Sequence, residues 1–179
     1  MEEVEHRFRV FAKEMDRLRE EIDSLRKEIV LNRSCIDVVG RLSVASSLIT
    51  SLAFYALSNI LRGEKLSYIS NSIKTIIDVA EIWKQIIKSL SQDVYQALKP
   101  FITSWTEAAE NTIKECLKAF FDYAKAKKAN FEQTLHILHS SFNNWGFLKY
   151  ISDDVVLETY GSEALSILKK YKETFLSRE

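Results

Sequence analysis

The sequence predicts an all-α fold: a bundle of five to six helices with a long, coiled-coil-like N-terminal helix. Near the N-terminus, apolar residues recur at alternating spacings of four and three, the heptad pattern of a coiled coil. The eight residues of this heptad stripe are Val4, Phe8, Phe11, Met15, Leu18, Ile22, Leu25 and Ile29. A second stripe of similar spacing runs from Leu66 to Ala97. The 179 residues include four glycines and one proline, too few turn residues for a β protein.

Helix stops and caps divide the chain into six expected helices. Gly63 follows the second, as glycine often follows a helix C-terminus, and Pro100 cannot continue the third because it lacks a backbone N–H. Ser89 and Ser91 compete for backbone hydrogen bonds, but the stripe continues across them, which favours one helix there. Ser152 can cap the last helix. The expected helices are residues 3–31, 34–61, 67–98, 103–127, 130–144 and 153–176.

We expect two parts, a heptad helix at residues 1–32 and a helical bundle at residues 33–179. The stripe of the first helix is narrow and its other faces are densely charged, which fits a projecting or dimerising arm. Packing as the outer helix of its own bundle is an equal alternative. The charged residues between positions 14 and 27 are Glu14, Asp16, Arg17, Arg19, Glu20, Glu21, Asp23, Arg26 and Lys27.

The overall charge is balanced, with 25 basic and 25 acidic residues. A molecule without net charge has no strong field to attract nucleic acid or anionic lipid, so any polyanion site must be a local patch. Two lone cysteines, Cys35 and Cys116, and a charged start without a signal peptide predict a cytoplasmic protein.

The twenty residues from Leu42 to Leu61 carry no charge, and this length can cross a bilayer. However, seven of the twenty are Ser, Thr or Asn, and the segment lacks the long aliphatic run that insertion favours. We interpret it as a buried central helix whose hydroxyls bond back to the carbonyl one turn earlier. A membrane-interacting helix is the less favoured alternative.

No residue pattern predicts an enzyme, a metal site or a cofactor. The glycines are isolated, so there is no phosphate-binding loop. Glu132, His136 and His139 share one face of a predicted helix, but a metal site would need a second ligating helix, so we favour hydrogen-bonded histidines. Cys35 and Cys116 lack a neighbouring His or a Cys-x-x-Cys partner, which predicts inert buried thiols.

Two lysine clusters are candidate contacts for nucleic acid, on the fourth and the last expected helices. Lysine ammonium groups bind phosphates in a salt-sensitive and sequence-independent way. The alternatives are that the first cluster complements the negative pole of a helix C-terminus and that the second is a solvated face. The candidates are Lys125, Lys127, Lys128, Lys169, Lys170 and Lys172.

Three stretches resemble a known family. Residues 47–55 read SLITSLAFY, residues 135–139 read LHILH before Trp145, and residues 163–165 read EAL before Leu168, Tyr171 and Lys172. In this order they resemble helices of the small subunit of type III-B (Cmr) CRISPR effector complexes, the first being similar to its Gly-Leu-x-x-Thr-Leu-Ala-Phe helix. Departures include Ser47 in the place of glycine and Lys170 in the place of tryptophan.

The resemblance implies a non-catalytic subunit present in several copies, which stacks along the backbone subunits and lines the path of guide and target RNA. Lys172 is the one basic residue that a resembling stretch carries. Arg41 and Arg62 flank the helix of the first stretch and are further candidates for RNA contact. Ion pairs with Asp37 and Glu64 are the alternative for these two arginines.

Three functional hypotheses follow. The first is a small subunit of an RNA-guided effector complex, with protein subunits, guide and target RNA and further copies of itself as partners. The second is a coiled-coil scaffold or adaptor without a nucleic-acid role, which depends on the heptads alone. The third, less favoured, is the membrane-interacting protein.

Overall fold

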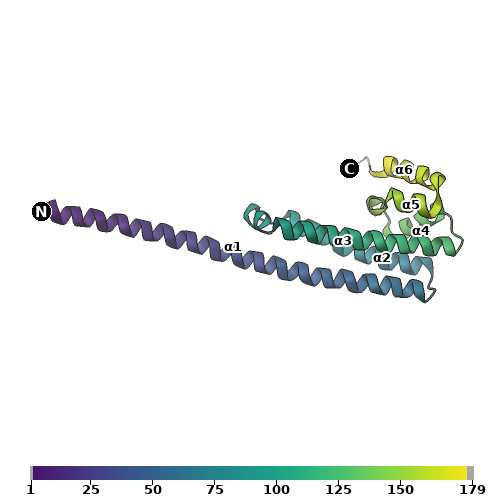
Figure 1. Ribbon diagram of the computed structural model, residues 1–179, viewed down its shortest axis with the longest axis horizontal. Coiled ribbons are helices and arrows are strands. Elements are labelled where there is room, and N and C mark those ends of the chain that lie inside the picture. Colours follow the sequence, from purple (N-terminus) through teal and green to yellow (C-terminus); the bar gives the residue numbers. More distant parts are fainter. Residues whose placement is uncertain (1, 177–179) are drawn as a thin grey trace.

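The computed structural model describes residues 2–176 and confirms the all-α prediction. Within this range there are six α-helices, one 3₁₀ helix and no strand (Figure 1). The elements are α1 (Glu2–Leu61), α2 (Leu66–Lys88), α3 (Gln92–Ala126), α4 (Phe131–Phe142), η1 (Gly146–Tyr150), α5 (Asp153–Tyr160) and α6 (Ser162–Leu176).

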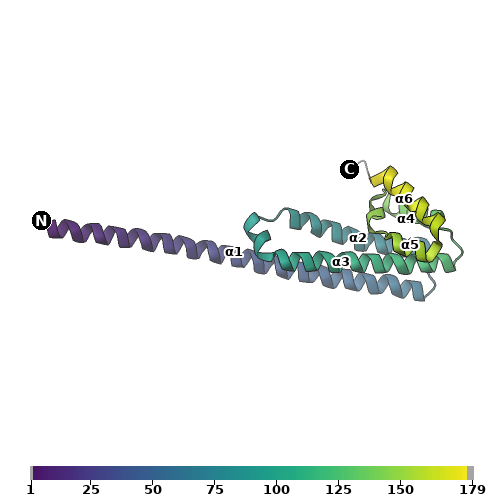
Figure 2. The ribbon, with the colours of Figure 1, turned by 45° about the horizontal axis from the view of Figure 1, so that its top comes forward.

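Helix α1 is one continuous helix of 60 residues, about 90 Å long at 1.5 Å per residue. The predicted break between residues 31 and 34 is therefore wrong, because no glycine or proline interrupts the helix there and core-facing residues resume with Val38. Every residue from 2 to 30 is exposed, and this half of α1 extends beyond the rest of the molecule (Figures 1 and 2). Of the two arrangements that the sequence left open, the structure has the projecting arm.

The predicted helix 67–98 is wrong, because the chain turns between α2 and α3. Ser91 caps α3, its hydroxyl accepting a hydrogen bond from the Val94 N–H at 3.3 Å, and Ser89 donates to the Ile86 carbonyl at 2.7 Å. These local hydrogen bonds of serine end one helix and start the next. The prediction that Pro100 ends the helix before it is also wrong: Pro100 lies inside α3, since buried Val94 and Ile102 on either side hold both parts in one helix.

The predicted helix 153–176 is also wrong, because Gly161 divides it into α5 and α6. Gly161 has φ 93° and ψ −176°, a conformation that residues with a Cβ rarely adopt. Helix α4 ends two residues earlier than predicted, at Phe142, because Asn143 takes a left-handed conformation with φ 57°. Its start fits the prediction closely: Asn130 and Gln133 form a capping box.

The core begins where α2 and α3 pack on one face of the second half of α1. Small side chains on α1, such as Ala45, Ala53 and Ala56, are buried there and let the neighbouring helices approach closely. Helices α4, α5 and α6 and η1 gather at the end of α2 and α3 farthest from the arm (Figures 1 and 2). Phe120, Phe147 and other large residues fill that end of the core.

The uncharged segment 42–61 lies within the bundle half of α1. Four of its hydroxyls donate to carbonyls four residues earlier, as expected; they are those of Ser43, Ser46, Ser47 and Thr50. The prediction of a buried central helix is wrong in one respect, since only one face of the segment is buried. Among the described helices, α1 alone is long and apolar enough to cross a membrane, and 28% of its most apolar window is buried in the protein.

Candidate interaction surfaces

The heptad stripe is a long, regular row of exposed large apolar side chains in the described part of the chain. Its eight residues lie on the projecting half of α1, and their exposed fractions range from 39% for Met15 to 69% for Phe8. Large apolar side chains that are exposed singly are ordinary, but a contiguous exposed row marks an interaction surface.

The charged faces of the arm stabilise it as a helix in water. Four of its arginines, Arg7, Arg9, Arg17 and Arg19, form ion pairs with carboxylates three or four residues away, such as Arg7 with Glu3 at 2.8 Å and Arg17 with Glu21 at 3.4 Å. Each exposed pair of this kind contributes about 0.2–0.5 kcal/mol to helix stability. The arm is therefore held helical by local interactions, while its apolar stripe stays uncovered.

The stripe continues along the bundle half of α1 as an exposed face. Ile36, Val44, Phe54 and Leu61 expose 68% or more of their surface. At 100° per residue, all four lie within about 60° of Ile22 around the helix axis. We call the surface formed by the heptad stripe and these four residues the free face of α1.

The free face points away from the bundle. The residues that α1 buries against α2 and α3 include Leu42, Ala45, Ile49 and Ala56. By the same helical geometry they lie about 140–200° from Ile22. Figures 1 and 2 agree with this placement, since α2 and α3 lie on one side of α1 and no described element lies along its other side.

The first lysine cluster, at the end of α3, is partly engaged within the protein. The Lys125 ammonium donates to the backbone carbonyl of Thr159 at 2.7 Å and so fastens the end of α5 to α3. Lys127 lies over the ring of Tyr123 with its nitrogen 5.4 Å from the ring centre. Lys128 is exposed, and its backbone has a left-handed conformation with φ 64°.

In the second lysine cluster, on α6, one lysine likewise binds within the protein and the other two are exposed. Lys172 donates to the carbonyl of Ile151 at 2.7 Å and pairs with Asp153 at 3.2 Å, which fastens α6 to the start of α5. Lys169 and Lys170 are exposed and make no ion pair with any described residue. Lys125 and Lys172 therefore hold opposite ends of α5 and do not share one surface.

The two arginine candidates lie far apart. Arg41 pairs with Asp37 at 3.1 Å, which is the alternative that the sequence offered for it. Arg62 is exposed in the turn after α1 and makes no ion pair with a described carboxylate. Twenty-one residues of helix and turn separate them, about 30 Å along the axis. The eight basic candidates thus do not form a single basic patch.

The two histidines of α4 belong to an aromatic cluster. His139 stacks on Trp145, with ring centres 4.2 Å apart, and Phe175 stacks on the same indole at 4.7 Å. The Tyr171 hydroxyl donates to Glu132 at 2.8 Å, and burial together with this hydrogen bond raises the pKa of Tyr171. The cluster joins two of the resembling stretches, residues 135–145 and 163–172. It consists of His136, His139, Trp145, Tyr171 and Phe175.

The metal hypothesis finds no support in this arrangement. Across residues 2–176, no three His, Cys, Asp or Glu side chains are grouped so that they could hold a metal ion. Glu132 is taken up by Tyr171, and the stacked rings of His139 and Trp145 occupy the space beside the histidines. In the sequence, only the resemblance points to Trp145, because two of its partners, Tyr171 and Phe175, are distant in the chain.

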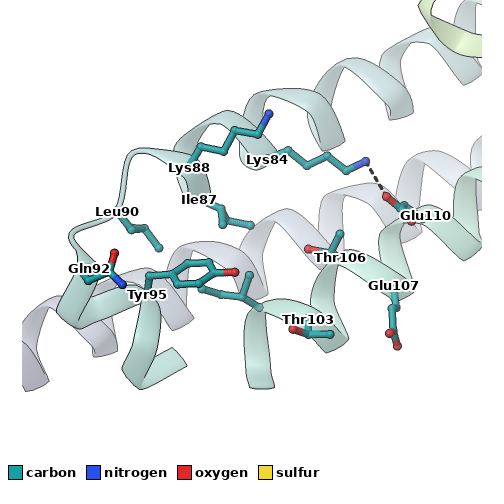
Figure 3. A pocket seen from close by; sticks show the side chains of 11 residues that line it. Lys84, Ile87, Lys88, Leu90, Gln92, Tyr95, Thr103, Thr106, Glu107 and Glu110 are labelled. Carbon is teal, nitrogen blue, oxygen red and sulfur yellow. Dashed lines mark hydrogen bonds and ion pairs between the residues drawn. The ribbon is translucent and has the colours of Figure 1, made fainter. Parts of the chain in front are cut away.

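An open cleft lies between α2 and α3 near the turn that connects them, with a volume of about 620 Å³ (Figure 3). Lys84 extends along it and donates to Glu110 at 3.0 Å. The Lys84 ammonium also donates to the Tyr150 hydroxyl at 2.8 Å, and that hydroxyl donates to Glu81. Glu81 is paired further with Lys149 at 2.7 Å.

The charged groups of this network stabilise one another. Burial alone would raise the pKa of Glu81, but hydrogen bonds from Lys149 and Tyr150 outweigh it and hold that pKa below its ordinary value. Burial and the neighbouring Glu81 raise the pKa of Tyr150. Such a network is typical of a structural tie between α2, α3 and η1. The sequence contains no local signal for it, since Tyr150 lies 66 and 69 residues from its two partners.

Comparison with known proteins does not assign the chain to a family. No protein-family model matches it, and no curated protein and no solved structure matches it. Functional inference therefore depends on the surfaces described above, of which the free face of α1 has the most regular spacing of apolar residues.

Proposed function

We propose that the protein is a non-catalytic scaffold or adaptor that acts by binding other macromolecules through its helix surfaces. The observation that carries the proposal is the exposed heptad stripe on the half of α1 outside the bundle. Fully burying an exposed apolar side chain of this size contributes about 1.5–3 kcal/mol, and the eight residues of the stripe, with 39–69% of their surface still exposed, would each contribute a part of this to binding a partner helix.

The arm and the bundle are structurally separate, which fits a scaffold that binds one partner through each. The bundle has its own core, centred on fully buried residues such as Ile76, Ile113 and Phe120, and does not need the arm to cover it. The arm extends about 45 Å from the bundle, at 1.5 Å per residue. A rigid helix of this length sets the distance between whatever binds the arm and whatever binds the bundle.

The test is partner capture in native cells with a variant of the stripe. Full-length tagged protein carrying Leu18→Ser and Leu25→Ser is compared with wild type by quantitative mass spectrometry. The matched control carries Val10→Ser and Val30→Ser, which alter exposed apolar residues of the arm outside the stripe. Partners that are lost with the stripe variant and kept with the control support the proposal. Identical partner sets for all three proteins contradict it.

A second candidate is the small subunit of an RNA-guided effector complex. It is supported by the contact between two of the resembling stretches in the aromatic cluster and by the exposed Lys128, Lys169 and Lys170. An electrophoretic shift with single-stranded RNA across a salt series tests it. Affinity should fall as salt rises, and Lys169→Glu with Lys170→Glu should weaken it while Lys13→Glu on the arm does not. No shift by the isolated protein or its assembled complex would remove this candidate.

A further inference from the structure

We infer that the arm pairs with a second copy of this chain, as a parallel, in-register, two-stranded coiled coil. The inference rests on the proposed scaffold function and names the partner of its arm. In heptad notation, the a positions are Phe8, Met15, Ile22 and Ile29, and the d positions are Val4, Phe11, Leu18 and Leu25. The stripe thus spans nearly four heptads, the length at which a coiled coil is sustained.

In the two heptads of the stripe nearest the bundle, the identity of the core residues favours two parallel strands. Ile22 and Ile29 are β-branched residues at a positions. Leu18 precedes Ile22, and Leu25 lies between the two isoleucines; both leucines are at d positions. In parallel coiled coils, isoleucine at a with leucine at d selects dimers over trimers and tetramers, because of the way each side chain enters the hole on the partner helix.

The charges beside the stripe select a second copy and its orientation. The g positions of three successive heptads are acidic and the following e positions are basic. In a parallel dimer each g residue faces the e residue five positions later on the partner, so all these pairs attract. In an antiparallel dimer g faces g and e faces e, so all of them repel. The pairs are Glu14 with Arg19, Glu21 with Arg26 and Glu28 with Arg33 of the second copy.

Five of these six charged groups are available to a partner, and the sixth, Glu21, accepts an exposed hydrogen bond from Arg17 at 3.4 Å. Arg26, Glu28 and Arg33 make no ion pair with any described residue of their own chain. Glu14 and Arg19 make only long, exposed pairs, of 4.0 Å with Arg17 and 3.9 Å with Asp16. Such pairs contribute little, so exchanging them for contacts across a dimer costs little.

The bundle leaves room for the second copy. Helices α2 and α3 pack on the side of α1 opposite to the free face, so a second α1 along the stripe meets neither of them (Figures 1 and 2). Beyond the arm, the exposed Ile36 and Val44 extend the apolar contact toward the bundle half of α1. The dimer therefore carries two bundles that point away from each other on a common stem.

The first experiment measures the mass of the full chain by sedimentation equilibrium at several concentrations. Wild type should show twice its 20.7 kDa, and Ile22→Lys should raise the dissociation constant at least about tenfold. Val10→Lys is the control, since Val10 and Ile22 each expose 48% in the single chain but Val10 lies off the stripe. Circular dichroism verifies that each variant is helical. A wild-type monomer at about 100 μM overturns the inference, as do equal effects of Ile22→Lys and Val10→Lys on the dissociation constant.

Charge exchange tests the pairing of opposite charges. One variant replaces Glu14, Glu21 and Glu28 by Arg, and another replaces Arg19, Arg26 and Arg33 by Glu. Each alone should dimerise at least about tenfold more weakly than wild type, and an equimolar mixture should recover the dimer. Unchanged dimerisation of either variant alone contradicts the pairing.

Disulfide trapping tests orientation and register. In a Cys35→Ser background, Leu25→Cys with oxidised glutathione should give a cross-linked dimer, since a parallel register places residue 25 beside its copy. Val10→Cys, off the stripe, should not cross-link. A dimer by mass without the Leu25→Cys cross-link overturns the parallel arrangement. A monomer overturns self-pairing but leaves the scaffold function standing if partner capture still depends on the stripe, so the two failures are distinguishable.

Discussion

The indole of Trp105 on α3 donates a hydrogen bond to the backbone carbonyl of Leu42 on α1, at 3.1 Å, joining residues 63 apart in the chain. Both side chains are buried, and Leu42 is the first buried residue of α1. The same carbonyl accepts the hydroxyl of Ser46 at 2.9 Å. This contact marks the point where the exposed arm becomes part of the bundle.

Replacing Trp105 should destabilise the bundle. Trp105→Phe removes the indole donor from a buried site and should lower the free energy of unfolding by about 1–3 kcal/mol, measured by urea denaturation with circular dichroism. Trp83→Phe is the control, because Trp83 is half-buried and its indole makes no hydrogen bond with a described residue. Equal losses for the two variants would show that the hydrogen bond contributes nothing beyond ring volume.

Replacement of Gly161 and of Gly40 by alanine should change the free energy of unfolding in opposite directions. Gly161 adopts φ 93°, so Gly161→Ala should lower the free energy of unfolding by about 1–3 kcal/mol. Gly40 lies within α1, and Gly40→Ala should raise it by about 0.5–1 kcal/mol. An added Cβ meets no atom within 4 Å at either site, so the backbone conformation alone separates them. Thermal unfolding of both variants measures the difference, and a shift of the same sign would contradict it.

Glu81 should make stability depend on pH in the acid range. Its pKa in the folded protein is below the ordinary value of 4.5, so the unfolded chain takes up the proton first as the pH falls. The stabilisation by Glu81 is therefore complete above this value and is lost as the pH drops through the folded pKa.

Denaturation of Glu81→Gln from pH 7 to pH 3 checks this expectation. The variant should be less stable than wild type at neutral pH, and the gap should close as the solution becomes acid. Glu107→Gln, an exposed carboxylate of α3 without an ion pair among the described residues, should follow wild type throughout. A gap that widens toward acid pH would reverse the sign of the linkage.

The two cysteines should differ in reactivity. Burial, and then the charge of Glu115, raise the pKa of the Cys116 thiol to about 11, so little reactive thiolate is present at pH 8. Cys35 is only half-buried on α1. Iodoacetamide should label one site in the native protein and two in urea, as counted by mass spectrometry. In Cys35→Ser the native label should disappear, and rapid native labelling of Cys116 would contradict its burial.

The sequence by itself determined the helical class and the heptad stripe. Both are local properties: apolar residues three and four apart share a helix face whatever surrounds them, and the scarcity of glycine and proline leaves few places to turn. Local chemistry also predicted a helix that starts near residue 130 and the hydroxyl bonds of residues 42–61 to their own helix. The stripe of the arm is visible in the sequence because no tertiary contact is needed to define it.

Tertiary structure decided where helices break and which charges are free. A proline or serine changes helix stability by about 0.5–3 kcal/mol, which packing can override, so α3 passes Pro100 while the chain turns near Ser89 and Ser91. The lysines looked alike in the sequence, yet Lys125 and Lys172 are bound to carbonyls 34 and 21 residues away. Contacts between distant segments follow from how whole helix faces pack, and no local spacing of residues encodes them.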